Sequence, residues 1–315
     1  MAFFNALPSA LAQGLIWGIM AIGVYITYKI LEMSDLTVDG SFATGGAVFV
    51  VLMIAGWNVW LAMVAAVVAG MLAGLITGIF HTLCGIPAIL AGILTQLGLW
   101  SVNLAIMGWS SNKAMNLKEV KLLTSMRFMQ EIKAGLQPFY KHPILVIGII
   151  TVVIIGLLYW FFGTERGASI RATGANVNMA RAQGINTNLN KVLGLMIGNG
   201  LVALSGCLWA QYFGFAEINM GRGAIVIGLA AIIIGDVTFG KIFSNFALKL
   251  LAVSIGSIIY YVVIQVVIST MDINTNLLKL ISALIVAGFL AVPYWKKRFF
   301  PPKKKIHTGK EKDHA

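Results

Sequence analysis

Long apolar runs alternate with short polar segments along almost the whole chain. A helix needs about 20 apolar residues to cross the roughly 30 Å of hydrocarbon in a bilayer, and many of these runs reach that length. The pattern therefore predicts an all-α fold, a polytopic bundle of about nine transmembrane helices, with eight or ten as the alternatives. The predicted spans are residues 9–30, 38–56, 58–80, 86–108, 142–162, 191–213, 223–240, 247–270 and 276–295.

Two of these runs are less regular than the others. The run 38–56 contains Asp39 and several glycines, among them Gly40, at which we expect the helix to break. The run 223–240 is short and contains Asp236. Broken helices at membrane depth are tolerated only where the backbone is buried in protein or lines a cavity. The run 38–56 is therefore a candidate for a solute pathway.

The composition supports a membrane domain with a basic tail. The 315 residues are 59% hydrophobic and 11% charged, and the mean hydropathy is +0.88. This apolar surplus predicts one integral membrane domain over residues 1–295. The net charge of +12 is concentrated in the tail 296–315. A basic cluster directly after a span is typical of a cytoplasmic flank and does not indicate nucleic-acid binding.

The distribution of Lys and Arg predicts the orientation. Placing the loop 163–190 and the tail 296–315 in the cytoplasm puts most positive charges inside, with the N-terminus outside and the C-terminus cytoplasmic. The loop 109–141 is then extracytoplasmic, although its lysines oppose this assignment. Its apolar residues leave two interpretations open, an amphipathic segment at the membrane surface or a solvated connector. No basic segment precedes the first apolar run, so we expect a retained span there.

Enzymatic and metal chemistry have little support in the sequence. The four histidines are scattered, no His, Cys and carboxylate cluster has metal-ligand spacing, and no catalytic residue is predicted. Residues 235–241 match the glycine-rich part of a nucleotide-binding loop. However, Ile242 stands where that loop needs Ser or Thr, and an apolar helix precedes it in place of a strand. We therefore expect no cofactor and no ATP on this chain.

Polar residues inside spans are costly and mark functional positions. Asp39 has two interpretations: it lines a solute pathway, or its carboxylate caps the N-terminus of the second span. For the amides within spans, interhelical hydrogen bonding is the default role, and a subset facing a central passage would contact a polar solute. The candidate pathway residues are Asp39, Ser41, Phe42, Gln96, Asn103 and Asn199.

The loop 163–190 is polar, basic and rich in small residues, and it is longer than a connection between spans requires. Gly174 permits a tight turn, Ala172 and Ala180 permit close approach of another helix, and Arg171 offers charge-assisted contacts. The loop is therefore predicted to be a docking surface for another protein, the alternative being a solvated connector.

Three segments carry a resemblance to a known family. Thr164–Asn176, followed by Ala180 and 184–186, resembles the cytoplasmic coupling motif of ABC importer permeases of the branched-chain amino-acid and ribose type. Met33–Gly46 is similar to the segment that opens their second span, and 221–240 to their glycine-rich late segment. The resemblance covers about 10–295. It is closest to the subfamily expected to carry aromatic amino acids such as tryptophan and tyrosine.

The resemblance implies a transport subunit in the bacterial cytoplasmic membrane. Two permease copies would form the pathway, two ATPase subunits would bind ATP and Mg²⁺ below them, and an extracytoplasmic solute-binding protein would deliver a small polar solute, an amino acid. The alternatives are a permease for a sugar or nucleoside, or an ion-coupled secondary transporter. A short helix around Arg171–Gln183 would dock in the ATPase. The implied coupling residues are Glu165, Arg166, Arg171, Ala172, Gly174, Asn176, Ala180, Gly184, Ile185 and Asn186.

Overall fold

The computed structural model describes residues 2–117, 120, 122–133, 138–240, 242–270, 280, 283–289 and 291. Helices account for nearly all of the regular structure. In chain order the elements are α1 (Ala2–Tyr25), the π-helix η1 (Ile26–Ile30), α2 (Thr37–Ile54), α3 (Val59–Thr82), α4 (Ala88–Ile106), β1 (Asn112–Ala114), α5 (Met126–Lys133), the 3-10 helix η2 (Phe139–Lys141), α6 (Pro143–Gly163), α7 (Glu165–Ala175), α8 (Val177–Ala182), α9 (Thr187–Phe213), β2 (Phe215–Glu217), α10 (Ala224–Phe239) and α11 (Phe246–Thr270).

The predicted all-α transmembrane bundle is confirmed. Within the described residues, seven helices are long and apolar enough to cross a membrane, and α10 is a shorter apolar helix. The first eight predicted spans correspond in order to α1 with η1, α2, α3, α4, α6, α9, α10 and α11. The ninth predicted span, 276–295, lies largely outside the described residues.

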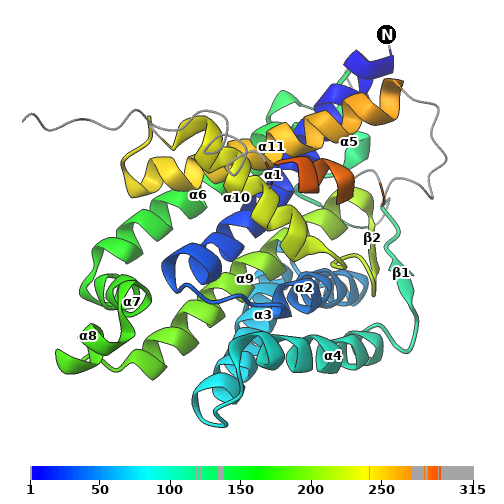
Figure 1. The fold of residues 1–315 in the computed structure, drawn as a ribbon. Helices are drawn as coiled ribbons and strands as arrows, with labels where there is room; N and C mark the ends of the chain where they lie inside the picture. Colours follow the sequence, from blue (N-terminus) through cyan, green and yellow to red (C-terminus); the bar gives the residue numbers. More distant parts are fainter. Residues whose placement is uncertain are drawn as a thin grey trace, which may run out of the picture.

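Helix α9 lies at the centre of the bundle (Figure 1) and packs against α1, α2 and α3. Helix α1 lies between α9 and α11, and α10 packs on α11. Burial separates α1, α2 and α9 from the other spans, since 83%, 72% and 61% of their apolar windows are buried but only 28% of that of α4 or α6. The peripheral helices therefore present their apolar side chains to the surrounding lipid.

Small residues allow α3 and α9 to approach closely. A side chain at Gly70 would collide with Ala203 and with the carbonyl of Asn199, and one at Gly74 with the carbonyl of Leu195. Membrane helices associate through such close backbone contacts because lipid supplies no hydrophobic driving force between them. The contact holds α3 rigidly against α9.

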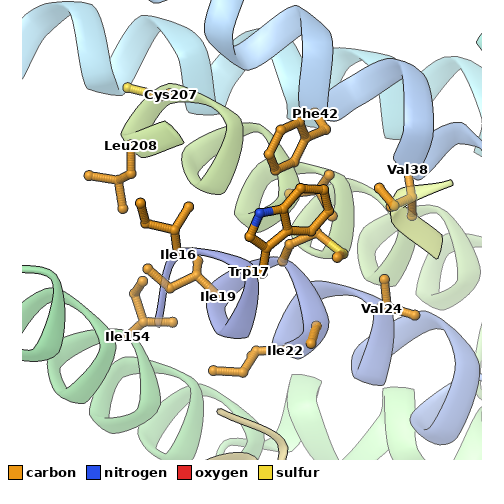
Figure 2. Packing of buried hydrophobic residues seen from close by; sticks show 14 of the residues in the cluster. Ile16, Trp17, Ile19, Ile22, Val24, Val38, Phe42, Ile154, Cys207 and Leu208 are labelled. Atoms are coloured by element: carbon orange, nitrogen blue, oxygen red, sulfur yellow. The ribbon is translucent and has the colours of Figure 1, made fainter. Parts of the chain in front are cut away.

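The apolar core is organised around α1. Trp17 of α1 stacks on Phe42 of α2, with ring centroids 4.8 Å apart (Figure 2), while Ile16 and Ile19 of α1 and Leu208 of α9 pack in the same cluster. Offset aromatic stacking of this kind adds about 0.5–1.5 kcal/mol to the contribution of burial. The core therefore fixes the first turns of α2 against α1.

The two ends of the bundle differ in structure. Helices α7 and α8 lie at one end, and β1 and β2 lie at the other (Figure 1). The two strands pair antiparallel with Asn112 opposite Glu217, and they join the 109–141 loop to the segment that follows α9. The backbone N–H of Leu123 donates to Gln211 of α9 at 3.3 Å, and Val120, Leu122 and Leu123 pack on the core. This part of the loop is attached to the bundle.

Candidate functional site

Two regions contain the predicted functional residues. The first begins at the non-helical link 31–36, which joins η1 to α2. Within the link Asp35 is only 2% exposed, and its carboxylate accepts hydrogen bonds from Thr37 N at 2.9 Å and from Asn199 Nδ2 at 2.6 Å. Burial raises the pKa of the Asp35 carboxyl, and these hydrogen bonds oppose the shift. The link is therefore held in place by buried polar contacts.

The start of α2 lies in the interior of the bundle. The Ser41 hydroxyl donates to Asn199 Oδ1 at 2.7 Å, both residues are fully buried, and Asn199 is near the middle of α9. The expected helix break at Gly40 is wrong, because α2 runs continuously from Thr37 to Ile54. The irregular backbone instead precedes α2. Gly40 serves close packing, since a Cβ there would lie 2.9 Å from the Leu99 side chain of α4.

Asp39 caps a helix, as one interpretation predicted, but the helix is α10 and not its own. Its carboxylate oxygens accept hydrogen bonds from Gly223 N at 2.9 Å and from Ile225 N at 3.1 Å. A carboxylate at this position satisfies two of the free N–H groups of the helix and complements its dipole. Helices α2 and α10 thus both begin beside Asp39.

A cavity of about 300 Å³ lies between α2, α4 and the segment that precedes α10; we refer to it as the Asp39 cavity. Asn103 is 1% exposed, and its Nδ2 lies 3.4 Å from the carbonyl oxygen of Gly40. Its Oδ1 has no hydrogen-bond partner among the described residues. The lining residues are Asp39, Gly40, Gln96, Leu97, Trp100, Asn103, Ile218, Asn219 and Arg222.

The cavity brings together only part of the predicted pathway set. Asp39, Gln96 and Asn103 line it, whereas the side chains of Ser41, Phe42 and Asn199 are buried in the packed interior. The pathway role of all six stays a prediction.

Sequence reasoning did not include Trp100, Asn219 and Arg222, which also line the cavity. The available signal was the position of Arg222 in a polar, glycine-rich stretch between two apolar runs.

The second region is the helix pair α7 and α8, whose ends are defined by capping side chains. Thr164 Oγ1 accepts from Gly167 N at 3.4 Å at the start of α7. Asn176 Oδ1 accepts from Met179 N at 3.0 Å and so begins α8. Asn186 begins α9 in the same way, accepting from Leu189 N at 3.1 Å. Two of the predicted coupling residues, Asn176 and Asn186, therefore shape the loop.

Helix α7 is held against three other elements. Gly174 is buried against the carbonyl oxygen of Ile30 in η1, where any side chain would collide. Asn190 of α9 donates to the Thr173 hydroxyl at 2.9 Å, and Gly167 packs on the backbone of Phe162 at the end of α6. These contacts attach α7 to the bundle.

The outward side chains of these helices form an exposed polar surface, which we call the docking surface. Two large apolar side chains, Met179 of α8 and the adjoining Leu189 of α9, are 46% and 44% exposed; sequence reasoning missed both. Ala172 and Ile185 are half-buried, while Gly174 and Ala180 are buried and support the surface from within. The remaining predicted coupling residues are exposed: Glu165, Arg166, Arg171, Asn176, Gly184 and Asn186.

The nucleotide-loop match at residues 235–242 has a different structure. Gly235 to Phe239 belong to α10, and Gly240 caps that helix, so no strand precedes a phosphate-binding loop. Among the residues that the structure describes, no group of three or more His, Cys, Asp or Glu side chains is arranged to hold a metal ion.

Comparison with known proteins identifies a family and several relatives to which the chain is similar. Residues 7–290 match the family described as "Branched-chain amino acid transport system / permease component". The chain is 39% identical over 287 residues to the tyrosine transport system permease protein of Clostridioides difficile (strain R20291), an alignment that covers 91% of each chain. It is 35% identical over 284 residues to uncharacterized protein RP368 of Rickettsia prowazekii (strain Madrid E), covering 90% of this chain and 95% of that one.

A more distant relative is the autoinducer 2 import system permease protein LsrC of Salmonella typhimurium. The two chains are 26% identical over 225 residues, which is 70% of this chain and 60% of the relative. No solved structure matches the chain.

Proposed function

The chain belongs to the family of branched-chain amino acid transport permeases, and from this membership we propose that it imports an amino acid of the aromatic class. Members of the family are permease components of ABC transporters, so the chain is a membrane-embedded transport subunit and not an enzyme. Its partners are an ATPase and a substrate-binding protein. The solute is proposed from the tyrosine transport permease, whose similarity covers 91% of this chain.

The ATPase is proposed to bind the docking surface. The observation that carries this proposal is a polar, exposed helix pair that is nevertheless fixed to η1, α6 and α9. Arg171 and Met179 are exposed there and provide a charged and an apolar contact. ATP and Mg²⁺ would bind the partner, one ATPase subunit to each of two permease copies.

The orientation of the chain in the membrane follows from the proposed ATPase contact. If α7 and α8 face the cytoplasm, the N-terminus lies on the outer side, because the opposite end of α1 leads into η1, which contacts α7. The β1–β2 end would then receive the solute-binding protein. The basic tail 296–315 would be cytoplasmic, in agreement with the positive-inside rule.

A second copy of the chain is proposed to cover the Asp39 cavity. Helix α4 is a peripheral helix whose Leu97 and Trp100 are 65% and 46% exposed. The same face opens on the polar residues Gln96 and Arg222. Charged and amide groups facing lipid are costly, and a symmetric partner would enclose them in a shared pathway.

The docking role is tested with Arg171→Glu. Arg171 is exposed, so the permease should fold, while reversal of the charge should reduce recovery of the ATPase in a pull-down and reduce solute uptake about tenfold or more. Arg127→Glu is the matched control, because Arg127 is exposed on α5 at the opposite end of the bundle. Normal pull-down and normal uptake for Arg171→Glu would refute the docking role.

A further inference from the structure

We propose that the Asp39 cavity binds the solute as an α-amino acid zwitterion with an aromatic side chain. Arg222 would hold the α-carboxylate, Asp39 and Asn103 would hold the α-ammonium, and Trp100 would pack on the ring. The inference rests on the proposed import of an amino acid and assigns the residues that recognise it.

The charges of the cavity match a zwitterion. Among the lining residues there is one cation, Arg222, and one anion, Asp39. No salt bridge joins Arg222 to a carboxylate in the described part of the chain. Arg222 is exposed at the mouth of the cavity, and the planar fork of a guanidinium matches a carboxylate. A neutral sugar would leave this charge unmatched.

The cavity also contains acceptors for the ammonium group. Asn103 Oδ1 is buried and has no hydrogen-bond partner among the described residues, which is costly unless a ligand supplies a donor. The Asp39 carboxylate accepts backbone N–H groups at both oxygens, and a carboxylate offers about four lone-pair sites in all. The Gln96 amide lines the same cavity. An ammonium group carries three N–H donors, so these acceptors can satisfy it.

The remaining walls are apolar and aromatic. Trp100, 46% exposed, stands beside Leu97 on α4, and Ile218 faces the same cavity. A ring can stack on the indole in an offset or edge-to-face arrangement. A volume of about 300 Å³ is at the lower limit for small-molecule sites, which suits a single amino acid better than a larger conjugate.

The site is tested in the complete transporter, reconstituted with its ATPase and substrate-binding protein in proteoliposomes. Arg222→Gln should lower the maximum rate of tritiated tyrosine uptake about tenfold or more, because the carboxylate loses a charge-assisted partner. Arg127→Gln, at an exposed arginine on α5, makes the same substitution outside the cavity and should transport normally.

A second variant covers the case in which Arg222→Gln does not assemble. Trp100→Ala removes a half-exposed side chain, so it should fold, and it should lower the rate of tyrosine uptake about threefold or more through loss of ring packing. Trp60→Ala is its control, because Trp60 is 59% exposed on α3 and is not among the residues that line the cavity. Equal rates for the two tryptophan variants would overturn the proposal.

The zwitterion requirement is tested by displacement, using the permease–ATPase complex in lipid nanodiscs without the substrate-binding protein. Bound tritiated tyrosine should be displaced by phenylalanine, but not by tyramine, which lacks the carboxylate, or by desaminotyrosine, which lacks the ammonium. Effective displacement by either analogue would overturn the site assignment.

These outcomes separate the two proposals. A wild-type transporter that imports no amino acid would refute the proposed function and the cavity assignment with it. A wild-type transporter that imports tyrosine, alongside an Arg222→Gln variant with an unchanged rate, would refute the cavity assignment alone.

Discussion

The docking surface and the Asp39 cavity arrange their polar groups in opposite ways. On the docking surface, Asn176 and Asn186 are satisfied by local caps, and the exposed Arg171 is free to be solvated. In the cavity, the buried Asn103 Oδ1 has no hydrogen-bond partner among the described residues. Water satisfies a polar group at little cost, whereas the interior of a membrane protein does not.

The difference shows that a different structural observation identifies each of the two sites. At the docking surface, contact residues are identified by side chains that point away from the bundle, because the side chains that cap helices already make local hydrogen bonds. In the cavity the informative property is which polar atoms lack partners. Substitutions in each region, and at an exposed ion pair outside both, separate these two kinds of contribution.

The largest effect is expected at the base of the docking surface. Gly174→Ala places a Cβ against the carbonyl oxygen of Ile30, so α7 must shift from η1. Overpacking of this kind costs about 1–3 kcal/mol, and we expect both a lower unfolding temperature and weaker ATPase recovery. Gly156→Ala is the control, because a Cβ at Gly156 on α6 meets nothing within 4 Å. Equal melting temperatures for the two variants would show that α7 is loosely attached.

An intermediate effect is expected at the cavity. Asp39→Ala removes both acceptors from the N-terminus of α10 and should cost about 0.5–2 kcal/mol, as loss of a helix cap does. Asp39→Asn retains one acceptor oxygen and should cost less. Thermal unfolding measures the stability, and uptake should fall in both variants if Asp39 contacts the solute. Unchanged uptake in Asp39→Ala would restrict this residue to its capping role.

The smallest effect is expected at the far end of α10. Lys29 Nζ and Asp236 Oδ2 are 3.1 Å apart, but their side chains are 52% and 36% exposed. Solvent screens such a pair, so Asp236→Asn should cost about 0.5 kcal/mol or less. A loss as large as that of Asp39→Ala, measured by the same thermal unfolding, would mean that this pair is shielded from water in the assembled transporter.

The sequence predicts the spans well because hydrocarbon thickness sets their length. The start of α6 at Pro143 and the end of α9 at Phe213 lie within a residue of the predicted bounds. Apolar patterning gives the depth of a residue but not its direction around the helix axis. For that reason Gln96 and Phe42 are both in the predicted pathway set, although one lines the cavity and the other stacks in the core.

The part of the site that sequence reasoning missed depends on contacts between distant segments. Asp39 meets the N–H of Gly223, and no local pattern shows that two helices begin at one point in the bundle. The same applies to Gly174, for which a turn was expected. Its role is instead to let the backbone of α7 approach Ile30. This role can be predicted only if the position of η1 is known.

The short link 31–36 connects the docking surface to the Asp39 cavity directly through the backbone. Its first residues follow Ile30, which touches Gly174, and Asp35 near its end is anchored to Asn199 just before the chain reaches Asp39. If binding of the ATPase displaces α7, as proposed, that displacement would reach Asp39 along the backbone of this link as well as through side-chain packing.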